Sequence, residues 1–374
     1  MNTVLILTGR YLPGYKDGGP VRSLLNLSEW MGDEVNIKIM CLDRDHGDTS
    51  PYPNVSINEW NTVGKAKVFY TPKFTKEEIE KQAQQADIVY SCGPYSDYAI
   101  MAMLLKKAGK IKAPLYIASM GSFSPDAYAI KGTKKKLFVL AMKLSGLFKR
   151  VIWSVTSDRE EEELKAIIGK NAKCVIAEDL ARKGTTPRNH NKIDDELKVL
   201  FLSRITRKKN LSVVPDILNK IDKNHRVCID IYGIAEDKDY LNECMDKFRM
   251  LSSNISWEYK GEIDSEGVPG VFADYDAFLF PTLGENYGHV IAESLAAGCV
   301  PVISDRTPWL DLDKNGSGFV CSLENLDTFA NAIDSLVTTD SSKYMEIVKS
   351  CYTYIENKNQ DSVNNSGYRK IFCG

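Results

Sequence analysis

Short apolar runs alternate with longer amphipathic stretches over most of the chain. The runs have the length and composition of buried strands, and the stretches repeat apolar residues every three or four positions, as helices do. In the first half the predicted strands are 4–8, 35–41, 67–70, 87–92, 114–119 and 151–155, and the predicted helices are 20–31, 76–84, 96–108 and 159–168. This alternation indicates a parallel sheet covered by helices on both faces.

A polar stretch at residues 181–196 interrupts the alternation. It contains Gly184 and Pro187 among several Thr and Asn residues and has no apolar period, so it is predicted to be a linker. The pattern then resumes, with predicted strands at 197–203, 227–232, 255–258, 277–281 and 300–304 and predicted helices at 209–221, 237–248, 265–273 and 287–297. The expected fold class is α/β, with two Rossmann-like domains facing each other across a cleft and ligands at the carboxyl ends of the strands.

The composition agrees with two globular domains and argues against several other classes. The chain has 374 residues, of which 43% are hydrophobic and 26% charged, as in ordinary globular proteins. Its 48 basic and 50 acidic side chains nearly balance, so a nucleic-acid partner is not expected. Nine scattered cysteines without a C-x-x-C pair, and only four histidines, favour a reducing cytoplasm and no zinc site.

Neither a signal peptide nor a membrane span is expected. The first apolar run, 3–9, begins without a basic leader and is interpreted as a buried strand. No apolar stretch reaches the roughly 20 residues that span a bilayer. The protein is therefore expected in the cytoplasm, either free or held on the inner face of the plasma membrane.

The segment from 280 to 293, with the sequence FPTLGENYGHVIAE, carries the most informative pattern. A buried strand is followed by a turn and an amphipathic helix, and Gly284 and Gly288 let backbone approach a ligand closely. The helix start offers N–H groups and a positive dipole end to an anion such as a diphosphate. Glu285 lies in the turn, and Glu293 lies about two helical turns further on. Because a carboxylate suits the adjacent hydroxyls of a ribose or a hexose, both could face one nucleotide sugar.

Glu285 and Glu293 form an E-x7-E motif, and the segment resembles the donor site of the retaining glycosyltransferases with GT-B fold. These form glycosyltransferase group 1 (family 4-like), which includes bacterial polysaccharide and O-antigen enzymes. The runs 296–303 (AAGCVPVI) and 307–309 (TPW) also match that family. The resemblance implies that Glu285 contacts the donor sugar near the reacting centre and that Glu293 binds the ribose hydroxyls. It also implies that the backbone after Gly284 holds sugar and phosphate, through Asn286, Tyr287, Gly288, His289 and Val290.

A basic loop, SRITRKKNL at 203–211, follows the first predicted strand of the second half. Arg and Lys here can neutralise a diphosphate, and Arg can do so with two parallel hydrogen bonds. The family has an arginine and a lysine at this spacing, which correspond to Arg204 and Lys209. Asn210 stands where the family often has glycine, and asparagine tolerates the left-handed backbone region. Arg204, Lys209 and Glu285 are therefore the expected catalytic residues.

Three further glycines are expected near the donor. Gly18 and Gly19 join the first strand to the first helix and would lie against the diphosphate across the cleft, as in the family, with an ordinary strand–helix turn as the alternative. Gly233 follows the strand 227–232 and, like the run 261–263, resembles a family loop that frames the nucleotide base. The G-x-G-x-x-G fingerprint of dinucleotide-binding proteins does not occur.

The loop after the strand 114–119 is the candidate acceptor site. Many relatives have a histidine before a glycine there, but Met120 precedes Gly121, so that contact cannot be carried over. Ser122 and Asp126 are candidates for binding acceptor hydroxyls, with a plain loop as the alternative.

Three D-x-D triplets occur, at 43–45, 274–276 and 311–313. They are interpreted as incidental, so neither a metal nor a cofactor is expected.

The stretch from Lys131 to Arg150 is basic and amphipathic. Apolar residues at 137, 138, 140, 141, 144, 147 and 148 fit one helical face, and lysines flank it. Such a helix could dock on an anionic membrane surface. A core helix with a solvated basic end accounts for the same pattern, and the two interpretations are compatible.

The expected organisation is an acceptor-binding Rossmann-like domain at 1–182, a linker at 183–196, a nucleotide-sugar-binding Rossmann-like domain at 197–355 and, by resemblance, a segment at 356–374 that crosses back to the first domain. The resemblance implies retaining transfer of a hexosyl unit from a nucleotide diphosphate sugar, taken as a UDP-sugar, to a glycan or lipid-linked glycan in bacterial surface polysaccharide assembly. A nucleotide-sugar 2-epimerase of the same fold and a non-catalytic sugar-nucleotide binder remain alternatives. The missing fingerprint disfavours an NAD-dependent dehydrogenase.

Overall fold

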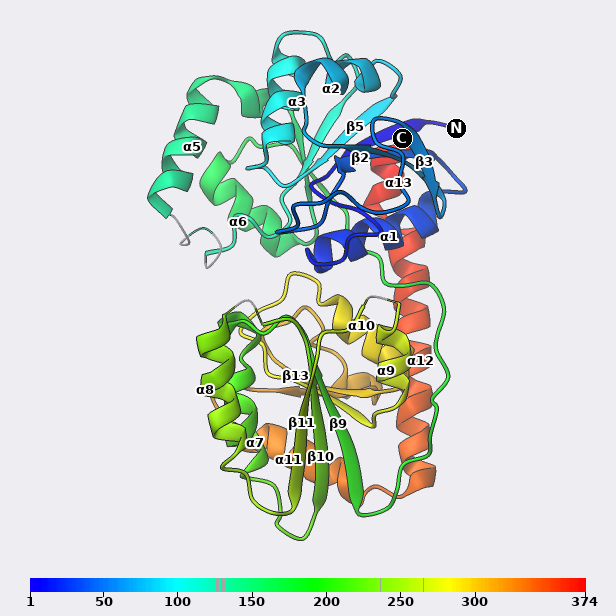
Figure 1. The fold of residues 1–374 in the computed structure, drawn as a ribbon, viewed down its shortest axis with the longest axis vertical. Helices are drawn as coiled ribbons and strands as arrows, with labels where there is room; N and C mark the ends of the chain where they lie inside the picture. Colours follow the sequence, from blue (N-terminus) through cyan, green and yellow to red (C-terminus); the bar gives the residue numbers. More distant parts are fainter. Residues whose placement is uncertain (126–127, 129–131, 236, 265) are drawn as a thin grey trace. The chain divides into compact units, whose positions relative to one another are not determined.

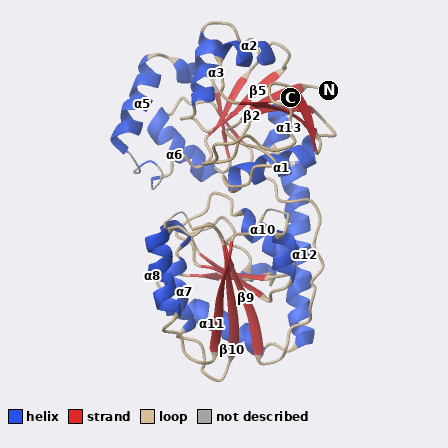
Figure 2. Ribbon diagram, viewed as in Figure 1, coloured by secondary structure: helices blue, strands red, loops and turns tan. Residues whose placement is uncertain are grey.

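Two compact units make up the protein in the computed structural model, which describes residues 1–125, 128, 132–235, 237–264 and 266–374 (Figure 1). The N-terminal unit comprises Met1–Leu180 together with Asp361–Gly374, and the C-terminal unit comprises Ala181–Gln360. The chain returns to its first unit at the end of the long helix α12 (Ser341–Asn364) and through α13 (Gly367–Phe372). Each unit contains a sheet with helices packed on it, which confirms the predicted α/β fold class (Figure 2).

The N-terminal unit is built on an eight-stranded sheet with the order β3-β4-β2-β1-β5-β6-β7-β8. Neighbouring strands run parallel except at the edge, where β3 pairs with β4 in the antiparallel sense. The strands are β1 (Thr3–Leu7), β2 (Asn36–Leu42), β3 (Trp60–Val63), β4 (Ala66–Thr71), β5 (Ile88–Cys92), β6 (Leu115–Ala118), β7 (Ile152–Val155) and β8 (Cys174–Ile176). The α-helices described in this unit, besides α13, are α1 (Gly19–Met31), α2 (Lys76–Ala83), α3 (Asp97–Lys107), α5 (Gly132–Leu144) and α6 (Asp158–Ile168).

The central strand β1 shows how this sheet is covered on both faces. Its side chains alternate between the two faces, as in any strand. Val4 and Ile6 belong to a core cluster that includes residues of α1 and α13, whereas Leu5 and Leu7 belong to a second cluster with residues of α2, α3 and α5. All four side chains are fully buried. The uninterrupted apolar run at the start of the sequence therefore encodes a strand that is buried on both sides.

The C-terminal unit is built on a six-stranded parallel sheet with the order β11-β10-β9-β12-β13-β14. The strands are β9 (Glu196–Leu202), β10 (Arg226–Tyr232), β11 (Ile255–Gly261), β12 (Ala277–Phe280), β13 (Val300–Ser304) and β14 (Phe319–Cys321). The α-helices, besides most of α12, are α7 (Val214–Leu218), α8 (Lys238–Phe248), α9 (Val268–Ala273), α10 (His289–Ala296) and α11 (Asp327–Thr338).

The strand order of this sheet reverses between β9 and β12. From β9 the chain adds β10 and β11 on one side, and it then returns to place β12, β13 and β14 on the other. In an open parallel sheet such a reversal opens a crevice at the carboxyl ends of the two strands, where ligands bind. A ligand site is therefore expected at the loops that follow β9 and β12.

In two predicted helices of this unit, a residue with a positive φ divides or delays the helix. The predicted helix 209–221 is divided into the 3₁₀ turns Arg207–Lys209 and Leu211–Val213 and the helix α7. The division occurs at Asn210, whose φ of 60° cannot continue a right-handed helix. The predicted helix 287–297 begins only at α10, because Gly288 before it has a φ of 86°.

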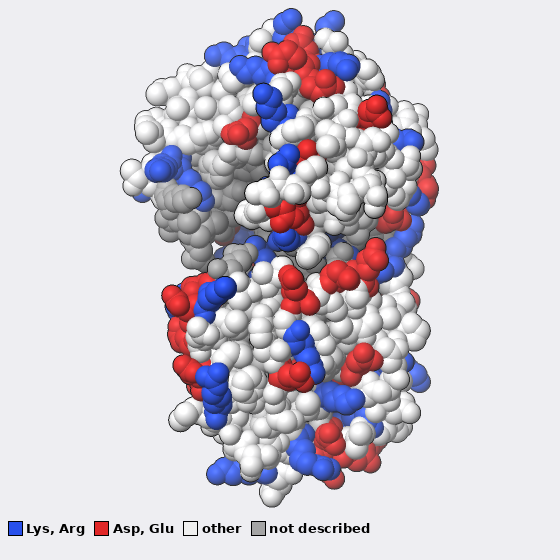
Figure 3. Space-filling model, in the orientation of Figure 1, with Lys and Arg blue, Asp and Glu red and all other residues white. Residues whose placement is uncertain are grey.

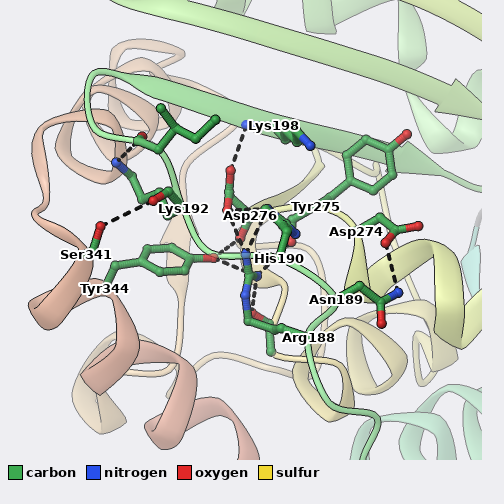
Figure 4. A network of polar contacts seen from close by, with 12 residues as sticks. Arg188, Asn189, His190, Lys192, Lys198, Asp274, Tyr275, Asp276, Ser341 and Tyr344 are labelled. Atoms are coloured by element: carbon green, nitrogen blue, oxygen red, sulfur yellow. Dashed lines mark hydrogen bonds and ion pairs between the residues drawn. The ribbon is translucent and has the colours of Figure 1, made fainter.

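A buried ion pair fixes the polar stretch predicted as a linker against the C-terminal sheet (Figure 4). Arg188 Nη2 lies 2.7 Å from Asp276 Oδ1, and these side chains are only 5% and 3% exposed. The Arg188 guanidinium also donates to the carbonyls of Tyr275 and Gly298 and to the Tyr344 hydroxyl. The Asp276 carboxylate accepts a further bond from the Lys198 amide. The D-x-D triplet at 274–276 therefore includes a buried structural ion-pair partner.

Replacing Arg188 with methionine is expected to lower the free energy of unfolding by about 3 kcal/mol, because the buried Asp276 carboxylate would lose its cationic partner. Urea denaturation measures this change. The matched control is Arg249→Met, which breaks an ion pair with Asp246 whose side chains are 66% and 72% exposed. That control should change stability by no more than about 0.5 kcal/mol. Equal effects of the two substitutions would show that the buried pair contributes no more than a surface pair.

Most of the cysteines are core residues. All nine are free, and most are buried. Burial raises the pKa of Cys92, Cys321 and Cys351 to about 12, so these thiols stay protonated at neutral pH and are poor nucleophiles.

Among the helices that the structure describes, none combines the length and the apolar character that crossing a bilayer requires.

Candidate active site

The predicted donor-site residues of the C-terminal unit lie at one edge of its sheet. Arg204 and Lys209 follow β9, Gly233 follows β10, and Glu285 follows β12. Because these strands are parallel neighbours in the sheet, their carboxyl ends meet at the same edge. The strands on either side of the reversal, β9 and β12, thus supply the three predicted catalytic side chains.

Lys209 and Glu285 are in direct contact although they are far apart in the sequence. Lys209 Nζ lies 2.6 Å from Glu285 Oε1, and the two side chains are 18% and 10% exposed. The Thr282 hydroxyl donates to the same carboxylate oxygen at 2.9 Å. Lys209 Nζ also lies over the Phe280 ring, 5.4 Å from its centroid. The carboxylate is therefore held in one place by a cation and a hydroxyl.

Backbone contacts join the loop after β9 to the loop after β12. The Leu283 amide donates to the Lys208 carbonyl at 2.9 Å, and Asn210 Nδ2 donates to the Pro281 carbonyl at 3.0 Å. Asn210 adopts the left-handed conformation, which asparagine tolerates, and its side chain makes a bond that glycine could not make. The two loops therefore form one unit that positions Lys209 beside Glu285.

The turn that carries Glu285 is also tied to the next strand. The Ser304 hydroxyl at the end of β13 donates to the Thr282 carbonyl at 2.6 Å. The Glu285 amide donates to the Arg306 carbonyl at 3.1 Å. Three strand ends, those of β9, β12 and β13, thus fix the position of the Glu285 backbone. Thr282, which sequence analysis did not identify, orients the carboxylate through its hydroxyl.

Gly233 packs directly against the loop that carries Arg204. Its φ is 147°, and a Cβ atom there would lie 1.7 Å from the Ser203 carbonyl oxygen. The strand-end backbone is hydrogen-bonded across this contact, from the Ser203 amide to the Tyr232 carbonyl and from the Ile205 amide to the Ile234 carbonyl. Only glycine permits this approach.

Two arginines of this loop have different environments. Arg204 is exposed at the sheet edge. Arg207 is directed to helix α8, where it pairs with Glu243 and lies over the Tyr240 ring. Arg207 is thus held by contacts with α8.

Gly288 is the residue that precedes α10, between the Glu285 turn and the helix. It adopts a left-handed conformation. A Cβ atom at this position would lie only 3.0 Å from Ile291 Cδ1. Tyr287 before it is buried and packs edge-on against Trp309, whose indole Nε1 donates to the Tyr287 carbonyl at 2.5 Å. The TPW run noted in the sequence thus supports the turn.

The remaining predicted donor residues of this unit occupy the same turn and helix. Glu293 is 7% exposed and lies in the second turn of α10. Asn286 is exposed, whereas His289 and Val290 are half-buried in the first turn. The first N–H groups of a helix have no carbonyl partner within it, so this helix start is suited to an anion.

The other candidates belong to the N-terminal unit. Gly18, with a φ of 66°, caps α1, and Gly19 begins that helix with open space around its α-carbon. Ser122 lies in the loop after β6, half-buried, and its amide donates to the Ser119 carbonyl. Asp126 lies outside the described residues.

Glu160 fixes the loop that holds Ser122, a role that the sequence did not reveal. Its side chain is 2% exposed on α6. The carboxylate accepts bonds from the Ser119 hydroxyl and the Gly121 amide, and from the amide and hydroxyl of Thr156. It thus ties together the loops that follow β6 and β7. Within the sequence Glu160 is one of four consecutive glutamates at a helix start, so nothing distinguishes it locally.

Residues 183–357 match the family model of Glycosyl transferases group 1. The matched segment falls on the C-terminal unit and contains the whole Lys209–Glu285 site. A curated relative, an uncharacterized glycosyltransferase of Methanocaldococcus jannaschii, is 23% identical over 146 residues, which are 39% of this chain and 37% of the relative. The aligned part thus spans little more than a third of that protein's length.

Solved structures of glycosyltransferases resemble the whole chain. HepE of Anabaena, in complex with UDP and glucose, has a TM-score of 0.67 and 15% identity, with 98% of this chain and 99% of that chain covered. WaaG, a glycosyltransferase involved in lipopolysaccharide biosynthesis, has a TM-score of 0.64 and 12% identity, with 99% and 100% covered. At these identities the likeness shows the fold, which is GT-B. The group 1 match and this fold together support a glycosyltransferase.

Proposed function

We propose that the protein is a retaining hexosyltransferase that uses a nucleotide diphosphate sugar, specifically a UDP-sugar. The observation that carries the proposal is the pairing of Lys209 with Glu285, 2.6 Å apart, at the point where the order of a group 1 glycosyl transferase sheet reverses. The complex of HepE with UDP and glucose supports the choice of donor.

Lys209 has two possible anionic partners in this reaction. In the structure its ammonium group bonds to Glu285. A bound diphosphate would offer it a second anion and would also attract Arg204 and the start of α10. As the sugar–phosphate bond breaks, negative charge grows on the diphosphate, and these fixed positive groups would stabilise it. Glu285 would meanwhile support the positive charge that develops on the sugar.

The proposed transfer requires no covalent intermediate on the protein. The bond between the anomeric carbon and the phosphate oxygen breaks, and its electron pair leaves with the diphosphate. The acceptor hydroxyl oxygen forms the new bond on the same face of the sugar, and its proton passes to the leaving phosphate oxygen. In this scheme Glu285 positions the sugar and does not act as a nucleophile, and Glu293 binds the ribose hydroxyls.

The proposed acceptor is a hydroxyl of a glycan or a lipid-linked glycan in bacterial surface polysaccharide assembly. The structural likeness to WaaG supports this class of pathway. The N-terminal unit would bind the acceptor through the loop of Ser122, and Gly18 and Gly19 would contribute to the donor side. A lipid-linked acceptor would also bring the protein to the inner face of the plasma membrane.

Thermal denaturation in the presence of UDP and UDP-hexoses tests the donor class. A ligand at a hundred times its Kd should stabilise the native state by about 2.7 kcal/mol, so UDP and one UDP-hexose should raise Tm, whereas NAD should not. The stabilising UDP-hexose should then yield UDP and a glycosylated acceptor. A changed nucleotide sugar without acceptor would indicate a 2-epimerase instead. Binding without turnover across acceptor classes would indicate a sugar-nucleotide binder.

A further inference from the structure

Helix α5 has apolar side chains on two opposite faces. On the inner face, Phe138, Val139 and Met142 pack against the core of the N-terminal unit. A helix that only covers a core carries polar residues on its other face. The outer face of α5 departs from this rule.

Three leucines project from the outer face. Leu137, Leu140 and Leu144 are 68%, 52% and 80% exposed. Successive helical residues are about 100° apart, so these leucines and the exposed Ala141 form a single stripe roughly 100° wide. Single exposed leucines are common, but a continuous stripe along a helix marks an interaction surface. We call it the α5 stripe, and it consists of Leu137, Leu140, Ala141 and Leu144.

Lysines border the α5 stripe on both sides. On the same helical projection, Lys134 lies on one side, and Lys136 and Lys143 lie on the other. All three are exposed. In Figure 3 the visible surface over α5 consists of Lys and uncharged side chains.

The charge of this part of the chain has one sign only. Residues 127–157 contain six lysines and one arginine but no aspartate or glutamate. This contrasts with the near balance of 48 basic and 50 acidic side chains in the whole protein. The basic charge is therefore concentrated around the helix that exposes the leucines.

We propose that the α5 stripe inserts into the headgroup region of an anionic lipid bilayer. The leucines would enter the boundary of the acyl chains, and the flanking lysines would contact anionic headgroups while their methylene chains lie along the same boundary. A protein partner would need acidic groups on both sides of an apolar groove, whereas an anionic bilayer supplies both features at every point of its surface. Vesicle binding involves neither donor nor acceptor, so this inference stands or fails separately from the proposed reaction.

Co-sedimentation with vesicles tests the proposal. The full-length protein should bind vesicles that contain phosphatidylglycerol and should bind pure phosphatidylcholine vesicles far more weakly. The triple variant Leu137→Ser, Leu140→Ser, Leu144→Ser should lose at least about tenfold in partitioning, because its apolar area no longer enters the bilayer. The control variant Met250→Ser, Leu310→Ser replaces two exposed apolar side chains of the C-terminal unit, which are 79% and 56% exposed. This control should bind vesicles as the wild type does.

A second set of variants separates charge from apolar insertion. The triple variant Lys134→Ala, Lys136→Ala, Lys143→Ala should lose roughly a hundredfold in partitioning to phosphatidylglycerol vesicles. Its matched control, Lys81→Ala with Lys343→Ala, removes lysines that are 66% and 76% exposed elsewhere and should change partitioning little. Circular dichroism should show an unchanged Tm for every variant. If the triple leucine variant is unfolded, Leu144→Ser alone replaces it in the comparison.

Three results would overturn the proposal. One is equal binding to the two kinds of vesicle, and another is equal loss in the stripe variants and in their controls. The third is a concentration-dependent dimer in analytical ultracentrifugation that the leucine variant abolishes, since the α5 stripe would then be a contact between two copies of the chain.

Discussion

Glu285→Gln is expected to reduce the turnover number for sugar transfer by about a hundredfold to a thousandfold. Glutamine keeps the size of the side chain and can still accept bonds from Lys209 and from the Thr282 hydroxyl, which meet the same carboxylate oxygen in the structure. What is lost is the negative charge that would face the sugar as positive charge develops on it. The measurement is the rate of UDP release in the presence of acceptor.

UDP affinity should survive this substitution. An interaction that matters only in the transition state lowers the turnover number while ground-state binding remains, so the Kd for UDP should change by no more than about threefold. Glu346→Gln, at an exposed position of α12, is the matched control and should keep full activity. Turnover of Glu285→Gln close to the wild-type rate would remove Glu285 from the reaction. A combined loss of UDP binding and stability would make its role structural.

Gly233→Ala is expected to lower the free energy of unfolding of the C-terminal unit by about 3 kcal/mol or more. The added Cβ atom would lie 1.7 Å from the Ser203 carbonyl oxygen and 2.7 Å from the Ser203 carbonyl carbon. The φ of 147° adds strain for any residue with a side chain. Relief of the clash requires the loop that carries Arg204 to move. Urea denaturation should record the loss, and UDP affinity should fall with it.

The control for this substitution is Gly270→Ala. Gly270 is exposed within α9, and a Cβ atom there meets nothing within 4 Å. Alanine favours a helix over glycine, so the variant should gain about 0.5–1 kcal/mol. If the two glycine variants had the same stability, the close approach between Gly233 and Ser203 would not exist in solution.

The sequence predicts most of the strands because most of them are local apolar runs. Strand β1, predicted at 4–8 and observed at Thr3–Leu7, is an example. It does not predict the short strands β3, β8 and β14, since three or four residues carry too little periodicity. Nor does it predict the end of the 3₁₀ turn at Asn210, which depends on a single backbone conformation. Local pattern thus determines element type more readily than element limits.

The candidate site is predicted in part for the same reason. The E-x7-E turn and the basic loop can be recognised from local sequence. The contact between Lys209 and Glu285 joins residues 76 positions apart and follows only once β9 and β12 are neighbours in the sheet. Glu160 is missed because its partners, among them Thr156 and Gly121, come from two separate loops. Side-chain exposure on α5 is likewise a tertiary property, so sequence alone leaves both interpretations of that helix open.

Hydrogen–deuterium exchange with and without saturating UDP tests the central claim most directly, because it locates the bound nucleotide along the chain. The account predicts slower exchange in peptides that cover residues 203–213 and 282–293, which contain the loop after β9 and the start of α10. Glu285→Gln should give the same protection. Unchanged exchange in both segments at saturation, with protection confined to other parts of the chain, would contradict the account.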